Sequence, residues 1–481
     1  MISKFVREQR RYTQQELCDI LECTESEAII YIRKLKEYGV LKAVKASEVQ
    51  KDLSDIQDED IEIADVEVGE NEYLYIFTFV GVIVVAGRAL KCYPKYLLHA
   101  TNPTSELQQV IKVLEKYNTK EQIVRMFNDS SEGQAFNLLA VLLFLLQDYY
   151  ENGVYSNTED IIESNGSGEI LWDKTINETF TLFSNNRPYY TELQTKRRVN
   201  DDFDYFKRLH ECILTIASEE LHEADLLKLF EIMEVDLTDE ELDEFGDKEY
   251  ILYRIEKELN TQFNTRKQLV LKTMYAYIDH SGTLFGTDCL SIFGTNSFNL
   301  VWEGVCADIM DNQLEKPLGS LKLPVPLKPE YDCKQKLKEL IERPLWTVTG
   351  KKANDTLIPD MVSIAETDQG CNFIIFDAKY YNARLEEDNP PKGQPGVESI
   401  IKQYLYQLAY QKFIKDHGFS KVRNCFLLPT EVNYVVDKGE ASLEMLGNLG
   451  LENIKVRLLP AKLAYEYYLS GRKMNMVDLN V

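Results

Sequence analysis

Two aspartates and a lysine in the C-terminal part of the chain have the types and spacing of a hydrolytic metal site. A buried apolar run at residues 373–376 leads directly into Asp377, Ala378 and Lys379. Side chains two apart on a strand share a face, so Asp377 and Lys379 point the same way while Ala378 offers its backbone carbonyl. Asp360 follows a proline, and the sixteen residues between it and Asp377 suit a neighbouring antiparallel strand.

These groups predict magnesium chemistry. Two carboxylates and a carbonyl form an all-oxygen site, which Mg²⁺ prefers. We therefore predict that Asp360, Asp377 and Ala378 hold one or two Mg²⁺ ions, while Lys379 orients or deprotonates the attacking water. Phosphodiester hydrolysis needs a barrier reduction on the order of 20 kcal/mol, which metal-activated water and charge stabilisation largely supply. The alternative is a surface turn with an ordinary Asp–Lys salt bridge.

Two predicted helices flank this motif. Glu303 lies beside the apolar stripe of a helix at residues 296–310 and is predicted to complete the metal site, the alternative being a solvated carboxylate. A second helix begins near Val397 and carries Gln403 and Gln407 on one face. A buried glutamine can bind a phosphate oxygen or support the lysine, and of the two we prefer Gln407.

The elements around the site predict a multidomain α/β protein. Capping boxes at Thr13 and Thr24, a helix that ends at Gly39, and a strand at residues 40–44 indicate a winged-helix unit. Glu25 and Glu27 open its second helix and would meet phosphates badly, so protein docking or a structural role is favoured over DNA reading.

Further along, two β-rich runs at residues 73–80 and 82–90 are separated by Gly81, and Gly87 marks another turn or bulge. The predicted segments are a winged-helix-like unit (1–48), an acidic linker (49–72), a β-rich and helical partner-docking region (73–165), a helical middle region (166–280), and a nuclease domain with a mixed sheet flanked by helices (281–481).

Composition limits the cellular setting and the mode of DNA binding. Nine scattered cysteines without a C-x-x-C pair suit reduced thiols in the cytoplasm, and the apolar run at 138–146 is too short for a membrane span. The formal net charge is −25, which repels nucleic acid at long range. Residues 51–72 hold ten carboxylates and one lysine, whereas residues 351–423 are neutral. We therefore expect a partner to help hold DNA.

Several passages resemble the LlaJI family of restriction endonucleases, relatives of the McrC nuclease subunit. They are Phe79-Val80-Gly81-Val82-Ile83, Pro94-Lys95-Tyr96, Ile170-Leu171-Trp172 with Thr175-Ile176, Arg187-Pro188-Tyr189-Tyr190, Phe298 to Glu303, Pro359-Asp360, Asp377 to Lys379, and Gln407 to Tyr410. The resemblance implies a PD-(D/E)xK nuclease fold and Mg²⁺-dependent cleavage of duplex DNA in a restriction system that serves anti-phage defence.

The resemblance also implies partners: a McrB-like AAA+ GTPase and a cognate DNA methyltransferase. The chain itself has no G-x-x-x-x-G-K-[ST] loop. Docking is expected at residues 73–160, and deletion of residues 1–160 is expected to leave the metal site intact. The rival interpretation is a non-enzymatic winged-helix DNA-binding or adaptor protein with a vestigial nuclease fold, against which the intact Asp360, Asp377 and Lys379 argue.

Overall fold

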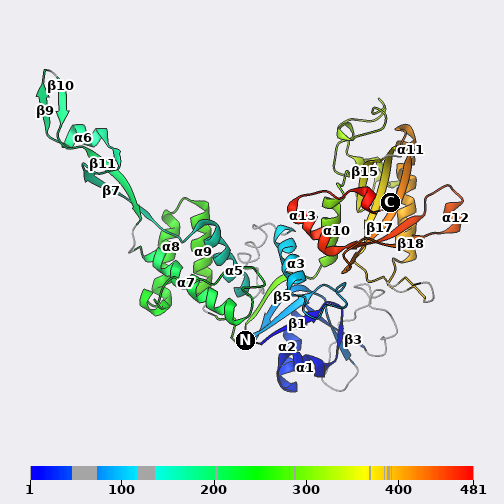
Figure 1. The fold of residues 1–481 in the computed structure, drawn as a ribbon, viewed down its shortest axis with the longest axis horizontal. Coiled ribbons are helices and arrows are strands. Elements are labelled where there is room, and N and C mark those ends of the chain that lie inside the picture. The colour runs from blue at the N-terminus through cyan, green and yellow to red at the C-terminus, as the bar shows by residue number, and fades with distance from the viewer. Residues whose placement is uncertain are drawn as a thin grey trace. The chain divides into compact units, whose positions relative to one another are not determined.

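The computed structural model describes residues 2–45, 73–117, 136–185, 187–200, 204–280, 282–286, 289–367, 370–383, 385–386, 390–391 and 393–479. The predicted acidic linker at 49–72 lies outside them. The chain divides into two compact units (Figure 1): unit 1 holds residues 129–291, and unit 2 holds residues 2–128 and 292–481. Unit 1 is therefore an insertion in the sequence of unit 2.

The N-terminal elements of unit 2 follow the predicted order. They are β1 (Ile2–Arg7), β2 (Arg11–Tyr12), α1 (Gln14–Leu21), α2 (Glu25–Glu37) and β3 (Leu41–Lys45). Both predicted capping boxes are confirmed. The side chains of Thr13 and Thr24 each accept from the backbone amide three residues on, and the threonine amides donate to the glutamate carboxylates at those positions. These elements are joined to later ones: β2 and β3 flank β4 (Tyr73–Phe77), and β1 pairs in parallel with β6 (Arg88–Tyr93).

The second sheet of unit 2 has the order β1-β6-β5-β12, with β5 at Val80–Val85 and β12 at Leu290–Thr295. Three strands thus replace the two predicted runs. Gly87, at φ 72°, lies between β5 and β6 as expected. Gly81 is not a turn but lies within β5, where a Cβ would collide with the Phe293 carbonyl of β12. The absence of a side chain at Gly81 permits this close approach of the two backbones.

Unit 1 combines a helical body with a strand-rich arm. The body contains α5 (Leu138–Asn152), α7 (Tyr205–Glu223), α8 (Lys248–Thr261) and α9 (Thr265–His280). The arm, residues 158–200, contains β7 (Thr158–Ser164), β8 (Glu169–Ile170), α6 (Trp172–Glu178), β9 (Thr181–Ser184), β10 (Arg187–Tyr190) and β11 (Gln194–Asn200). The predicted helical region at 166–280 is therefore wrong for residues 181–200, where strands predominate and Thr, Phe and Tyr favour them.

The C-terminal sheet of unit 2 is mixed, as predicted. Its order is β15-β16-β17-β19-β18, formed by β15 (Met361–Thr367), β16 (Gly370–Ala378), β17 (Lys421–Thr430), β19 (Ile454–Pro460) and β18 (Val436–Ala441). β16, β17 and β19 are parallel, while β15 and β18 are antiparallel to their neighbours. The helix α11 (Val397–Asp416) connects β16 to β17, the crossover that parallel strands require.

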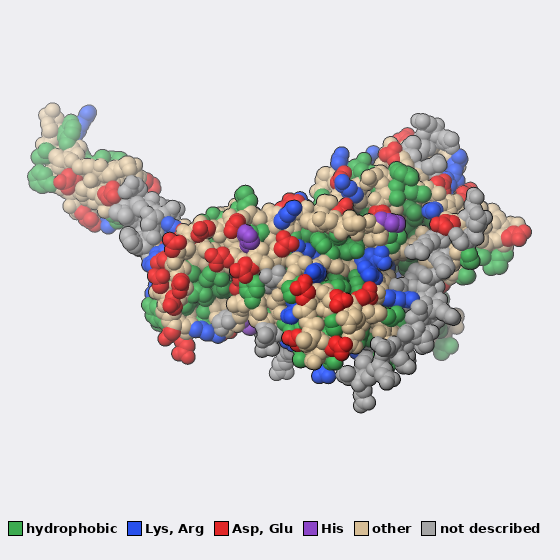
Figure 2. Space-filling model, turned by 60° about the horizontal axis from the view of Figure 1, so that its bottom comes forward, with side chains coloured by type: hydrophobic (Ala, Val, Ile, Leu, Met, Phe, Trp, Pro, Cys, Tyr) green, Lys and Arg blue, Asp and Glu red, His purple; other side chains and the backbone are tan. Residues whose placement is uncertain are grey.

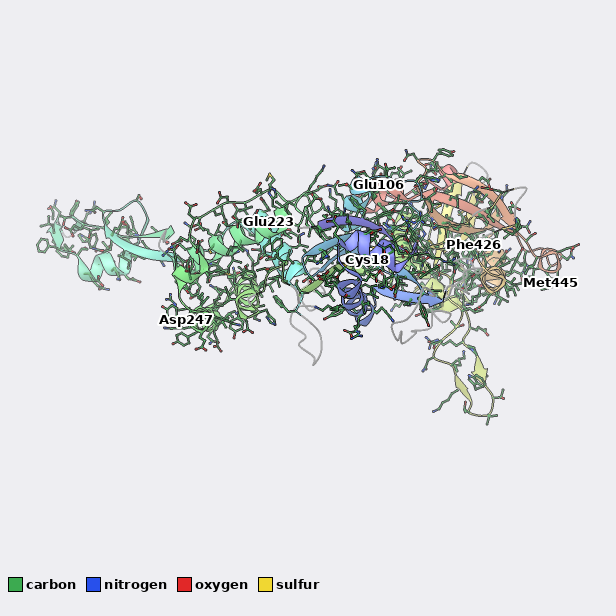
Figure 3. The ribbon with its side chains drawn as sticks, turned by 90° about the horizontal axis from the view of Figure 1, so that it is seen from below. Cys18, Glu106, Glu223, Asp247, Phe426 and Met445 are labelled. Atoms are coloured by element: carbon green, nitrogen blue, oxygen red, sulfur yellow. The ribbon has the colours of Figure 1, made fainter. Side chains whose placement is uncertain are left out.

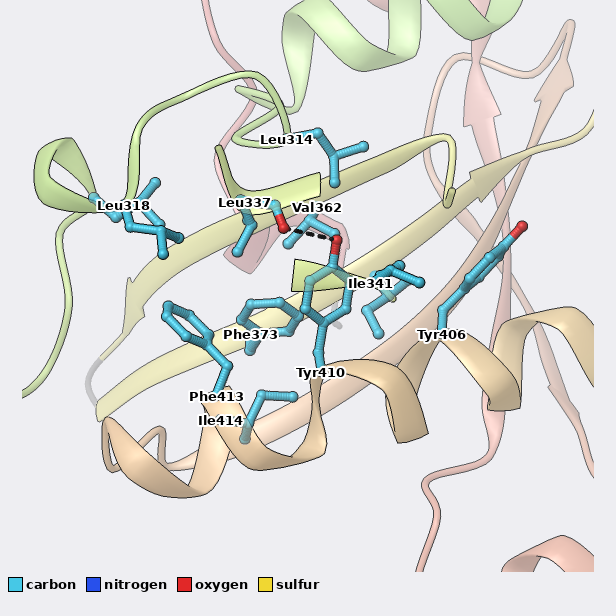
Figure 4. Packing of buried hydrophobic residues seen from close by; sticks show 12 residues of the cluster. Leu314, Leu318, Leu337, Ile341, Val362, Phe373, Tyr406, Tyr410, Phe413 and Ile414 are labelled. Atoms are coloured by element: carbon cyan, nitrogen blue, oxygen red, sulfur yellow. Dashed lines mark hydrogen bonds between the residues drawn. The ribbon is translucent and has the colours of Figure 1, made fainter. Parts of the chain in front are cut away.

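Two helices hold this sheet in place. α11 packs on it through a buried cluster that includes Phe373, Tyr410 and Phe413 (Figure 4). The helix α10 (Phe298–Ile309) contacts β16, and its fully buried Trp302 donates through Nε1 to the Leu427 carbonyl of β17 at 3.3 Å. Within the described residues, no helix is both long and apolar enough to cross a bilayer.

Candidate active site

The strand ends of β15 and β16 bring the predicted motif together. β15 and β16 pair with Met361 opposite Phe376, so Asp360 and Asp377 occupy adjacent positions at one end of the sheet. Asp360 Oδ2 accepts from the Ala378 amide at 3.0 Å. Lys379 Nζ lies 2.8 Å from Asp377 Oδ1 in a largely buried ion pair. The predicted antiparallel relation of the two aspartates is therefore confirmed.

The loop after α10 fixes the position of Asp360. The Asn312 side chain donates to the Asp360 carbonyl at 3.3 Å and accepts from the Val362 amide at 3.1 Å. Ser363 Oγ, also buried, donates to the Met310 carbonyl at 2.5 Å. These bonds attach the start of β15 to the end of α10, so the two predicted site elements share one frame.

The carboxyl groups of the cluster disfavour one another's ionisation. Burial, together with the neighbouring Asp377 and Glu303, raises the pKa of Asp360 to about 8, although Lys379 opposes the change. Burial and Asp377 likewise raise the pKa of Glu303. Burial acts to lower the pKa of Lys379, but Asp377 and Asp360 outweigh it and raise that pKa. Like charges held apart from water favour a bound cation.

Glu303 lies on the face of α10 that turns toward this cluster. Its carboxylate is half-buried and interacts electrostatically with Asp377, Asp360 and Lys379. Within the described residues, however, no three His, Cys, Asp or Glu side chains gather closely enough to coordinate one ion. The structure therefore places Glu303 beside the two aspartates without forming a three-carboxylate centre.

The two glutamines of α11 have different partners. Gln403 is fully buried and donates to the Ile375 carbonyl of β16 at 2.8 Å. Gln407 accepts from the Asn424 side chain at 2.7 Å and from the Glu452 amide at 3.1 Å. In the described part of the chain, the hydrogen bonds of Gln407 thus tie α11 to β17, and the glutamine that contacts the strand of the motif is Gln403.

The donor set at the strand ends suits a hard cation. Asp377 Oδ1 is buried and, among the described residues, has no hydrogen-bond donor in favourable geometry. Its ion-pair partner is Lys379, so this oxygen retains lone pairs for a further ligand. Together with Asp360 and the Ala378 carbonyl, it fits the oxygen preference of Mg²⁺.

Sequence reasoning missed two tyrosines beside the motif and the N-terminal glutamate that one of them binds. Tyr406 of α11 is nearly buried, and its hydroxyl points away from the other labelled core residues in Figure 4. Burial, Asp377 and Asp360 raise its pKa to about 12. Tyr380, directly after Lys379, donates to Glu8 Oε2 at 2.5 Å, and Glu8 also accepts from the Lys95 amide at 3.1 Å. No local signal marks a contact across 372 residues.

The sequence matches the LlaJI restriction endonuclease family model over residues 79–326 and 328–459. The chain therefore belongs to the LlaJI restriction endonuclease family. A relative is the type II restriction enzyme BsuMI component YdjA of Bacillus subtilis (strain 168), which is 26% identical over 414 residues, covering 84% of this chain and 83% of that protein.

Two solved structures from Thermococcus gammatolerans show a weaker likeness. One is a half-complex of McrB AAA+ hexamers with bound McrC, at a TM-score of 0.37 and 13% identity, covering 98% of this chain and 99% of that chain. The other is the McrBC complex, at a TM-score of 0.26 and 12% identity, covering 63% and 84%. Because both TM-scores are below 0.5, the family assignment rests on the sequence matches.

Proposed function

We propose that this chain is the DNA-cleaving subunit of a restriction system and hydrolyses duplex DNA with one or two Mg²⁺ ions. The observation that carries the proposal is the meeting of Asp360, Asp377 and Lys379 at adjacent strand ends. In this proposal the mixed sheet is a PD-(D/E)xK nuclease core, and the N-terminal elements are a winged-helix unit. Membership of the restriction endonuclease family, whose model covers residues 328–459, supports the nuclease assignment of the sheet.

Each residue has a defined task in this reaction. Bound Mg²⁺ supplies charge neutralisation and an acidified water. Asp360, Asp377 and the Ala378 carbonyl would hold the cation, and Glu303 would position water or the ion from α10. Lys379 holds the attacking water and balances charge on the phosphate while the water oxygen bonds to phosphorus and the P–O ester bond breaks. Gln403, and less directly Gln407, keep α11 against the sheet.

The test is plasmid cleavage with and without Mg²⁺, in the presence of the GTPase partner. Lys379→Ala and Asp377→Asn should each lower the cleavage rate at least 100-fold. Lys412→Ala is the matched control, since this lysine of α11 is 78% exposed. Unchanged cleavage in either site variant would refute the site assignment, whereas a wild type that does not cleave would favour the rival function, a non-enzymatic adaptor with a vestigial nuclease fold.

The partner in this proposal is a McrB-like AAA+ GTPase that delivers the DNA, and a cognate DNA methyltransferase protects the host. The relative's description as one component of an enzyme supports a multi-subunit system, and so does the net charge of −25, which disfavours unaided DNA binding. Acidic side chains gather over the helices of unit 1 on the face shown in Figure 2, as suits a surface that meets protein.

The exposed apolar residues indicate where the partner docks. The predicted docking region at 73–160 buries most of its described apolar side chains. The arm of unit 1 instead exposes Trp172 (53%), Phe180 (75%) and Phe183 (75%), and apolar side chains gather near its end in Figure 2. Such clusters mark protein interfaces, so we propose the arm as the docking site.

Co-elution of purified chain and GTPase tests this assignment. Phe180→Ser with Phe183→Ser should abolish the complex, whereas Phe263→Ser, which alters an even more exposed phenylalanine of the same unit (94%), should not. Complex formation by the double variant at wild-type affinity would refute docking through the arm.

A further inference from the structure

A projecting hairpin of unit 2 has the composition of a DNA-contacting element. It consists of β13 (Leu345–Trp346) and β14 (Lys351–Lys352), which pair antiparallel. Trp346 is 66% exposed, and Arg343 and both lysines of β14 are exposed as well. In Figure 3 the yellow-green hairpin stands clear of the sheet of its unit. An exposed tryptophan between cations contributes little to folding.

The hairpin ends a basic stretch in an acidic chain. Residues 316–352 contain nine Lys and Arg and four Asp and Glu, a net charge of +5 against −25 for the whole protein. Four lysines of this stretch are paired with acids outside it: Lys336 and Lys338 with Glu315, Lys316 with Asp311, and Lys328 with Asp416. Among the described residues, Arg343, Lys351 and Lys352 form no ion pair, so their charge is available to an anionic ligand.

The base of the hairpin is fixed beside the candidate site. Thr356 Oγ1 donates to the Glu342 carbonyl at 2.6 Å, and the Ala353 amide donates to the Pro344 carbonyl at 2.8 Å. Ile341, at the start of the hairpin, belongs to the buried cluster that also contains Val362 of β15. The hairpin is thus mounted on the core that positions Asp360, rather than on a free tether.

The short segment between the hairpin and Asp360 limits the distance between them. Eight residues lead from Lys352 to Asp360, and eight residues span at most about 28 Å when fully extended. One turn of duplex DNA is about 34 Å long. A duplex whose scissile phosphate sits at Asp360 is therefore long enough to reach the hairpin cations within one turn.

We propose that this hairpin binds the duplex within one turn of the cleaved phosphate, with Arg343, Lys351 and Lys352 on the phosphate backbone and Trp346 in the adjacent groove. The proposal rests on the proposed nuclease function and assigns its substrate contact. It also gives the acidic chain a local means of holding DNA. Phosphate contacts fix position without reading sequence, so the hairpin sets how the duplex lies in the site, not which sequence is cut.

Fluorescence anisotropy with a labelled 30-base-pair duplex, measured in EDTA so that no cleavage occurs, tests the inference. Lys351→Ala with Lys352→Ala should weaken binding at least tenfold near 0.1 M salt and lower the slope of log K against log salt by about 1.8, at about 0.9 per phosphate contact. Lys257→Ala with Lys272→Ala, two exposed lysines of unit 1, makes the same charge change and should leave the slope unchanged.

Trp346 supplies an independent signal. Trp302 is fully buried and Trp172 lies in the arm, so in a Trp172→Phe background the exposed emission comes from Trp346. Duplex DNA should quench this emission, and Trp346→Ala should weaken binding without changing the salt slope because it removes no phosphate contact. The hairpin variants should keep the wild-type melting temperature, since the altered side chains are exposed.

The outcomes separate this inference from the proposed function. Wild-type affinity and slope in the double lysine variant, in a protein that still cleaves DNA, would overturn the hairpin assignment alone. Loss of GTPase binding in the same variant, with DNA binding retained, would identify the hairpin as a protein contact and equally overturn it. A wild-type complex that neither binds nor cleaves duplex DNA would overturn both.

Discussion

Replacing Asp360 by asparagine should stabilise unit 2 in a pH-dependent way. Asparagine is nearly isosteric, its Oδ1 can still accept from the Ala378 amide, and its Nδ2 can donate to Asp377. The wild-type pKa of Asp360 is raised by burial and by Asp377 and Glu303, from 3.8 to about 8. A raised carboxyl pKa means that the folded state binds the proton more tightly than the unfolded state. The stabilisation of the fold by protonated Asp360 is therefore fully present below pH 3.8 and is lost as the pH rises through 8.

The size of the effect follows from the shift. About four pH units at 1.36 kcal/mol each give an upper limit of about 6 kcal/mol above pH 8. Asp360 is partly exposed, and solvent screens part of this repulsion, so we expect about 2–3 kcal/mol. In a unit of this size, that corresponds to roughly 5 °C in melting temperature.

Calorimetric melting from pH 5.5 to pH 8.5 without divalent cations measures the effect. The gain of Asp360→Asn over wild type should grow steadily across this window. Asp355→Asn, an exposed aspartate on the same segment, should show no such growth, and subtraction of the two curves removes the titration of all other groups. A gain that is constant with pH would show that the two carboxyl groups do not oppose each other, and would refute the electrostatic account of the site.

Two other perturbations test the packing of each unit. Trp302→Ala should cost unit 2 about 3–5 kcal/mol of unfolding free energy in denaturant titration, because it empties a buried site and breaks the bond to Leu427; a loss below about 1 kcal/mol would contradict this packing. Burial, and to a smaller extent Arg266, lowers the pKa of His210 to about 3. The neutral ring accepts a hydrogen bond from the Tyr155 amide. The contribution of neutral His210 to the stability of unit 1 should be present above pH 6.5 and be lost by up to about 1.4 kcal/mol per pH unit below it. Hydrogen exchange in unit 1 measures this loss. Amide protection in wild type that does not change with pH, after correction for intrinsic exchange, would refute it.

Local patterns predicted the parts of the fold that depend on neighbours in sequence. The capping boxes at Thr13 and Thr24 involve residues three apart, and the strand that leads to Asp377 carries its own apolar signal. The spacing from Asp360 to Asp377 predicted the antiparallel pair, because one short turn leaves few alternatives. Each of these features is stabilised by residues close to it in the sequence.

The features that sequence reasoning missed depend on distant partners. Helical spacing placed Gln403 and Gln407 on one face but did not tell which of them contacts β16, since that depends on how α11 lies on the sheet. The expectation that the metal site survives deletion of residues 1–160 stays a prediction, but a long-range contact bears on it. Glu8, directly after β1, binds Tyr380, and β1 pairs within a sheet completed by β12. Deleting residues 1–160 would remove part of the support of Lys379.

The insertion of unit 1 into unit 2 has a consequence for synthesis. Strands β1, β6 and β5 leave the ribosome long before β12, which completes their sheet, because residues 129–291 come between the two parts of unit 2. At about 5–20 residues per second, the edge of β5 waits on the order of ten to forty seconds for that partner. Unit 1 is contiguous and can fold meanwhile, so unit 2, which carries the candidate site, should mature last.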